Sequence, residues 1–141
     1  MDKVIRFFKF IFYILIVFLV IVSIFPGSLL GFLVFGDISR QPNLIDNPYY
    51  QVLPWRFYSI GSAINHLVTF FLISLIGFSI YFKNSNFQLL VYIFFSFSII
   101  LEVIQIIIPN RAFEIYDVSA NFSGVLLAYL VVKIYISRRK K

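Results

Sequence analysis

Polar and ionisable side chains gather in one stretch of a chain that is otherwise almost entirely aliphatic and aromatic. Between residues 101 and 124 they are Glu102, Gln105, Arg111, Glu114, Asp117 and Asn121. Carboxylates can move protons, amides can orient a polar ligand, and a planar guanidinium can clamp a phosphate or a carboxylate. The series is therefore a candidate site for acid–base chemistry or for ligand binding.

The composition places this series in a membrane protein. The 141 residues are 61% hydrophobic and 13% charged, and the mean hydropathy is +0.95. At roughly 20 residues per crossing, this length allows three to five spans and no separate soluble domain. A net charge of +6 could suggest nucleic acid, but the basic residues lie mostly at the two ends and in one short turn, so we expect no nucleic-acid partner.

The residue inventory restricts the chemistry further. The chain has no cysteine and one histidine, which excludes disulfides, thiolate metal sites and cysteine nucleophiles and argues against zinc. A divalent ion would have only Glu102, Glu114 and Asp117 as carboxylate ligands. No phosphate-binding loop or nucleophile elbow is present either. We expect no metal and no cofactor.

Apolar runs and the residues that interrupt them predict how the chain crosses the membrane. Four transmembrane helices are expected at about 7–25, 60–82, 87–108 and 118–136, in a single domain over residues 1–141. Pro26 should end or kink the first helix. Turn residues fill 36–58, which predicts an extracytoplasmic loop whose Tyr49, Tyr50, Trp55 and Tyr58 lie at the headgroup level.

Lysine and arginine set the orientation of this all-α bundle. Four crossings put both termini on one side, together with most of the basic residues: Lys3, Arg6, Lys9, Lys83, Lys133, Arg138, Arg139, Lys140 and Lys141. The opposite side holds only Arg40, Arg56 and Arg111. Because basic flanks resist translocation, both termini are predicted to be cytoplasmic.

This topology brings the polar residues to one layer near the outer face. Glu102 and His66 should each lie about 9 Å below the outer surface, and Asn121 about 5 Å below it. Glu102 and Gln105 share one helix face. A shallow outward-facing pocket follows, with His66, Glu102 and Asp117 as candidate catalytic groups and Gln105, Arg111, Glu114 and Asn121 as candidate ligand-binding groups.

The same residues also have purely structural interpretations. Glu102 and Gln105 could hydrogen-bond across helices to Asn121 as packing contacts. Arg111 and Glu114 could form a solvated ion pair at the surface, and Asp117 could cap the fourth helix. The cost of an ionisable group at the centre of a membrane helix, roughly 2.5 to 3.5 kcal/mol, favours the functional interpretation for Glu102.

The order and spacing of these residues resemble a known family. Glu102-x-x-Gln105-x-x-x-Pro109-x-Arg111, followed by Asp117-x-x-Ala120-Asn121-x-x-Gly124, is similar to the signature of VanZ-like membrane proteins, and His66 fits the same pattern. The resemblance covers roughly the last three helices. It implies a small multi-pass protein of the bacterial cytoplasmic membrane, in a family whose founding member confers low-level resistance to the glycopeptide teicoplanin.

The chain departs from that pattern just before the histidine. Ser62 and Ala63 stand where the family often has an Asp-Lys pair, and Phe70 replaces a frequent tyrosine. The missing lysine removes a cation that could pair with Glu102. A family mechanism that relies on this pair, and teicoplanin resistance with it, is therefore in question for this chain.

Two functions are compatible with the sequence. In the first, the outer pocket binds or acts on a cell-envelope lipid or a lipid-linked glycan, and His66 or Glu102 is the acid or base if the protein is an enzyme. In the second, the protein is a non-enzymatic scaffold or partner subunit whose polar residues only pack helices. A second copy of the chain or a larger membrane complex would be the partner in that case.

Overall fold

The computed structural model describes residues 2–39 and 58–139, and within these ranges all regular structure is helical. The helices are α1 (Asp2–Ile24), α2 (Leu29–Phe35), α3 (Tyr58–Tyr81), α4 (Phe87–Ile104), the 3₁₀ turn η3 (Gln105–Ile107) and α5 (Ile115–Arg139). The predicted all-α class is confirmed.

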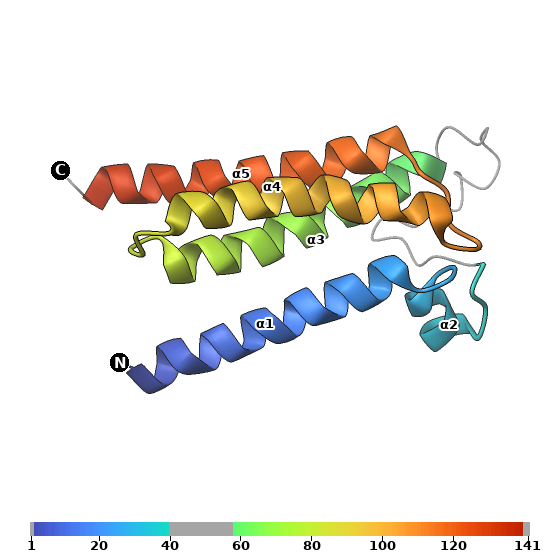
Figure 1. Ribbon diagram of the computed structural model, residues 1–141, viewed down its shortest axis with the longest axis horizontal. Helices are drawn as coiled ribbons and strands as arrows, with labels where there is room; N and C mark the ends of the chain where they lie inside the picture. Colours follow the sequence, from blue (N-terminus) through green and yellow to red (C-terminus); the bar gives the residue numbers. More distant parts are fainter. Residues whose placement is uncertain (1, 40–57, 140–141) are drawn as a thin grey trace.

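Four of these segments are long and apolar enough to cross a membrane, which confirms the predicted multi-pass bundle. They are Lys3–Ile24, Gly61–Tyr81, Phe87–Ile107 and Ile115–Arg139. At 1.5 Å per residue each exceeds the ~30 Å of bilayer hydrocarbon. Both chain termini lie at one end of the bundle (Figure 1), here called the terminal end; the opposite end is called the loop end.

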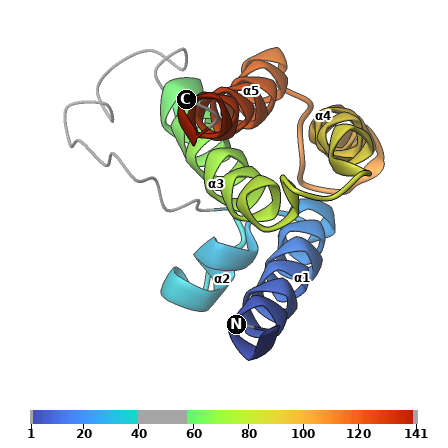
Figure 2. The same ribbon diagram turned by 90° about the vertical axis from the view of Figure 1, so that its left-hand side faces the viewer.

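The bundle is organised around α3. Viewed along its axis, α3 lies between α1, α4 and α5, while the short α2 lies outside the four long helices (Figure 2). The most extensive helix contact is between α3 and α5. It depends on Gly124, where a Cβ atom would lie 2.5 Å from the carbonyl oxygen of Leu67. Buried Ala120 and Ala128 continue a stripe of small residues that allows this approach.

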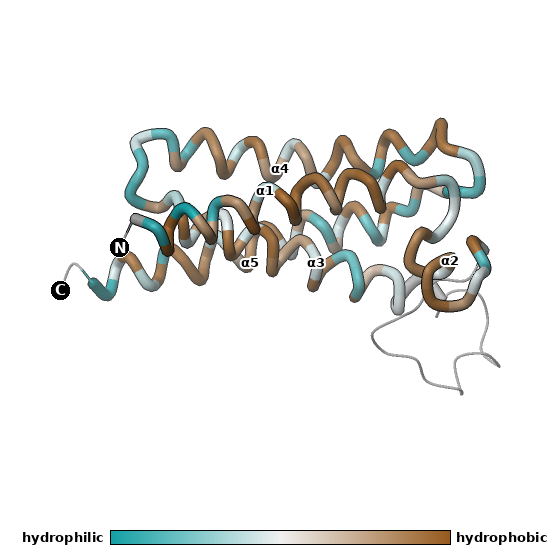
Figure 3. Tube along the Cα trace, turned by 90° about the horizontal axis from the view of Figure 1, so that it is seen from below, coloured by the Kyte–Doolittle hydropathy of each residue, from teal (hydrophilic) through white to brown (hydrophobic). Residues whose placement is uncertain are grey.

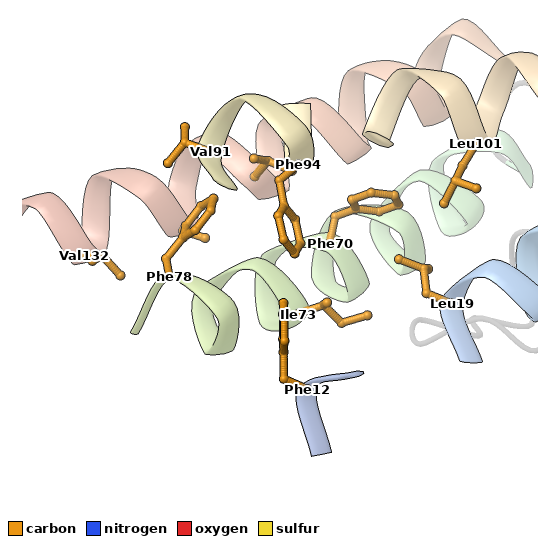
Figure 4. Close-up of a cluster of buried hydrophobic side chains, with 11 residues drawn as sticks. Phe12, Leu19, Phe70, Ile73, Phe78, Val91, Phe94, Leu101 and Val132 are labelled. Atoms are coloured by element: carbon orange, nitrogen blue, oxygen red, sulfur yellow. The ribbon is translucent and has the colours of Figure 1, made fainter. Parts of the chain in front are cut away.

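Aromatic rings fill the core towards the terminal end (Figure 4). The ring centroids of Phe78 and Phe94 lie 5.4 Å apart in an edge-on pair, and Phe12 of α1 stacks on Phe94 at 6.0 Å. Gly77 makes room for the Phe12 ring, which a Cβ atom there would meet at 2.6 Å. These contacts attach α1 to α3 and α4 through the first half of α1.

Helix α2 was not expected as a separate element, although local signals for it are present in the sequence. Ser28 caps it by accepting a hydrogen bond from Gly31 N–H at 2.9 Å, and Gly36 ends it in the left-handed conformation. Hydrophobic residues make up most of α2 (Figure 3), and the side chains of five of them are exposed: Leu30, Phe32, Leu33, Val34 and Phe35. Such a surface belongs in hydrocarbon rather than in water.

Helix ends differ from the predicted ones where charged residues are compatible with a helix. The first helix begins at Asp2 rather than near residue 7, because lysine and arginine are good helix formers and do not end a helix. The last helix begins at Ile115 rather than Val118. The carbonyl of Glu114 accepts its first backbone hydrogen bonds, so the expectation that Asp117 caps this helix was wrong.

The predicted extracytoplasmic loop lies largely outside the described residues. Only 36–39 of this segment precede the gap, and its aromatic residues Tyr49, Tyr50 and Trp55 fall within 40–57. Their expected position at the headgroup level remains a prediction.

Replacing Gly124 with alanine tests the helix contact. In an exposed helix this change would stabilise the fold by up to about 1 kcal/mol, whereas here the added methyl group meets the α3 backbone. We expect a loss of about 1 to 3 kcal/mol, as for other overpacked sites, measured by unfolding in detergent. Ser119→Ala, at an exposed position of the same helix, is the control. Equal stability of the two variants would contradict this packing.

Candidate functional site

The polar residues singled out in the sequence meet at the loop end, inside the bundle. They come from the first turns of α3, the last turn of α4 with η3, the loop that follows, and the first turns of α5. Glu102, Gln105, Asp117 and Asn121 are all buried. The structure therefore brings together groups that are up to 55 residues apart in the chain.

The carboxylate of Asp117 joins α5 to α3. Its Oδ2 accepts a hydrogen bond from Ser62 Oγ at 3.0 Å and lies 3.5 Å from His66 Nε2. Ser62 and His66 are four residues apart, so they occupy one face of α3. The position of Asp117 in the first turn of α5, where a helix dipole favours negative charge, suits a carboxylate.

His66 extends this cluster to α4 and fixes where protons lie. Its Nδ1 is 3.0 Å from Asn121 Oδ1, and Asn121 Nδ2 donates to Ser98 O at 3.4 Å. Since this orientation makes Asn121 Oδ1 the acceptor, Nδ1 carries a proton. Ser62, His66, Asp117 and Asn121, here called the imidazole cluster, thus place an imidazole 3.5 Å from a carboxyl group, with one hydrogen-bonding neutral side chain on each.

One oxygen of this cluster has no partner. Asp117 is 5% exposed, and its Oδ1 makes no hydrogen bond with any residue that the structure describes. An unsatisfied buried acceptor costs about 1 to 3 kcal/mol, and more when it is charged. The oxygen is therefore available to a further hydrogen-bond donor.

Glu102 forms a second group beside the imidazole cluster. It is fully buried, and its carboxylate accepts hydrogen bonds from Gln105 Nε2 at 3.2 Å and from Glu114 N–H at 3.5 Å. The contact with Gln105 confirms that these two residues share one helix face. The tighter η3 turn begins at Gln105, next to this carboxylate.

Arg111 is not part of the expected surface ion pair with Glu114. Its guanidinium donates to the carbonyls of Val22 at 2.7 Å and Phe25 at 3.2 Å, at the end of α1 where helical carbonyls lack partners. Burial lowers the pKa of Arg111, although the nearby Glu102 carboxylate favours its charged form. Arg111 thus holds the end of α1 against the loop that precedes α5.

Glu114 lies at the edge of the site. Partial burial raises the pKa of its carboxyl, and repulsion by the Asp117 carboxylate adds to this effect. Within residues 2–39 and 58–139, no group of three His, Cys, Asp or Glu side chains could hold a metal ion.

The residues of the site border two adjoining cavities. A polar pocket of about 140 Å³ is bordered by Ser39, Ser62, Glu114 and Asp117, among others. A larger cavity of about 430 Å³, here called the deep cavity, reaches Glu102 and Asn121 on one side and apolar residues on the other. Four residues border both spaces: Ser28, His66, Gln105 and Arg111. All seven residues predicted for the site therefore border one continuous region.

Sequence reasoning missed three polar contributors. Ser62 was taken only as a departure from a family pattern, yet it donates to Asp117; its spacing of four from His66 was the available signal. Ser28 borders both cavities from the start of α2. Ser98 contributes its backbone carbonyl, which no residue pattern could have indicated.

A multi-pass membrane bundle with a carboxylate, amide and imidazole site at its loop end is the class defined by this geometry. The chain belongs to the VanZ/LLP1 family, whose model matches residues 10–136. No curated protein and no solved structure matches it. The match begins within α1 and covers the whole described site.

Proposed function

We propose that this VanZ/LLP1 protein resides in the bacterial cytoplasmic membrane and binds or acts on a cell-envelope lipid or lipid-linked glycan at its loop end. The single observation that carries the proposal is that Oδ1 of buried Asp117, next to a polar pocket, has no hydrogen-bond partner among the residues 2–39 and 58–139. A ligand hydroxyl or amine would supply the missing donor, and sugars and lipid headgroups carry such groups.

The imidazole cluster supports a chemical role as well as binding. His66 and Asp117 lie 3.5 Å apart at the border of the pocket, and an imidazole beside a carboxyl group can accept a proton from a ligand hydroxyl and return it. Ser62 and Asn121 hold the two groups in place. If the protein modifies its ligand, His66 and Asp117 are the acid–base pair and Glu102 is a further carboxyl at the same cavity.

A second candidate function, the packing scaffold, is favoured by the interhelical hydrogen bonds of the cluster, which tie α3 to α5 and α5 to α4. Measured bonds of this kind between membrane helices average about 0.6 kcal/mol. The unpartnered oxygen of Asp117 costs about 1 to 3 kcal/mol, so the one interhelical hydrogen bond to this carboxylate, from Ser62, does not offset it. This balance favours a ligand over a scaffold.

Orientation decides whether the ligand lies in the outer leaflet. The terminal end carries Lys3, Arg6, Lys9, Lys83, Lys133, Arg138 and Arg139. Because basic residues favour the cytoplasmic side, the loop end would be extracytoplasmic and the site would face the outer leaflet.

Single cysteines in this cysteine-free chain test the orientation. Ser39→Cys at the loop end and Ser85→Cys at the terminal end replace exposed residues of the same type. In intact cells we expect a membrane-impermeant maleimide to label the first and not the second, because only the loop end faces outward. Labelling of Ser85→Cys alone would place the site on the cytoplasmic side.

Conservative substitutions separate the ligand site from the scaffold. Asp117→Asn and Glu102→Gln keep the shape and much of the hydrogen bonding but remove the acidic groups. At equal membrane expression, we expect each to abolish the change in susceptibility to teicoplanin or other envelope-directed agents that the intact protein confers.

Gln88→Ala, at an exposed position near the terminal end, is the matched control and should behave as the intact protein. A scaffold predicts a different pattern, in which Glu102→Gln is silent and Glu102→Leu lowers the folded yield. Full function of both conservative variants would therefore contradict the proposed ligand site.

A further inference from the structure

The deep cavity lies between two attachment points of α1. In its first half, α1 contacts α3 through the Phe12 ring at Gly77 and a hydrogen bond of 2.9 Å between Tyr13 and Tyr81. At its end it is held by Arg111. Between these points, residues of α1, α2, α3 and α4 surround about 430 Å³ of open space, a volume within the range of ligand pockets.

This cavity opens sideways. Leu30 of α2 and Leu72 of α3 both border it, and they are 40% and 50% exposed. Leu72 lies eleven residues after Gly61, about 16 Å along the spanning segment and thus near the middle of the hydrocarbon. The opening therefore meets lipid rather than water. The apolar helix α2, which contributes Leu30 to the border of the cavity, lies outside the four long helices (Figure 2).

The two ends of the cavity differ in polarity. At the lipid side it is bordered by Leu30 and Leu72. About 9 Å from Leu72 along α3 it reaches His66, and Glu102 of α4 borders it too. The polar pocket continues from there. Acyl chains beside an apolar opening would fill it, because an empty space forfeits dispersion contacts that a chain can make.

From this gradient we propose that the deep cavity admits one hydrocarbon chain of a membrane amphiphile through the opening between α2 and α3, with the headgroup in the polar pocket. The inference rests on the proposed function and narrows its ligand to a lipid or lipid-linked molecule. Lipid tails are as apolar as leucine, so moving an acyl chain from the bilayer into the cavity gains no hydrophobic free energy. Selectivity therefore lies in the headgroup.

Photolabelling tests chain entry directly. The intact protein is placed in vesicles of phosphatidylethanolamine and phosphatidylglycerol, which include phosphatidylglycerol with a diazirine in its acyl chain. We expect labels on Leu19 and Leu101, which border the cavity but are only 7% and 4% exposed. Ordinary surface lipids reach exposed residues such as Val17 but not these two.

Substitutions at the opening complete the test. Leu72→Trp should reduce labelling of Leu19 and Leu101 several-fold because the larger side chain narrows the entrance. Leu127→Trp changes a similarly exposed leucine of α5 away from the cavity and should leave labelling unchanged. Labels confined to exposed residues in the intact protein would overturn chain entry.

This result is separable from the proposed function. If Asp117→Asn and Glu102→Gln lose function while Leu19 and Leu101 stay unlabelled, the ligand site stands and chain entry is wrong. If both are labelled while the two variants remain fully active, chain entry stands and the role of the acidic groups is wrong.

Discussion

The interaction on which the site depends is the contact of the Asp117 carboxylate with Ser62, which donates a hydrogen bond to it, and with His66, whose Nε2 lies 3.5 Å away. Inside a bilayer no bulk water competes for these groups, so a buried carboxylate must find its donors in the protein or in a ligand. Ser62 and His66 meet that demand at one oxygen only. The other oxygen has no partner among the described residues and is where we propose that a ligand binds, and the same contact aligns the loop ends of α3 and α5.

The rest of the fold makes that contact geometrically possible. Gly124 lets the backbones of α3 and α5 approach until side chains as short as serine and aspartate can meet. Asn121 carries the network on to α4. Arg111 fixes the end of α1 at one border of the deep cavity. These three features belong to one arrangement: small residues pack α3 against α5, Arg111 caps the end of α1, and the polar cluster joins the helices. Through them the apolar helices position a polar site at the edge of the hydrocarbon.

Most of the bundle follows from hydropathy, because four long apolar runs have few alternatives in a membrane. The layer of polar residues also follows, since their depths along ideal helices bring His66 and Glu102 level. The sequence could not predict which hydrogen-bond partners the polar side chains have. Arg111 binds backbone carbonyls rather than a carboxylate, and Asp117 turns to α3 instead of capping α5. These partners depend on how each helix is rotated about its axis and on which backbone carbonyls lack a hydrogen bond. A pattern of residue types indicates neither.

The central claim is that Asp117 Oδ1 is kept for a ligand, and an experimental structure of the protein in lipid nanodiscs tests it most directly. Our account predicts an elongated amphiphile with its chain between α2 and α3 and a donor atom of its headgroup at hydrogen-bond distance from Asp117 Oδ1. A structure in which a side chain of the protein itself donates to that oxygen, and in which the deep cavity is closed by packing, would contradict the account.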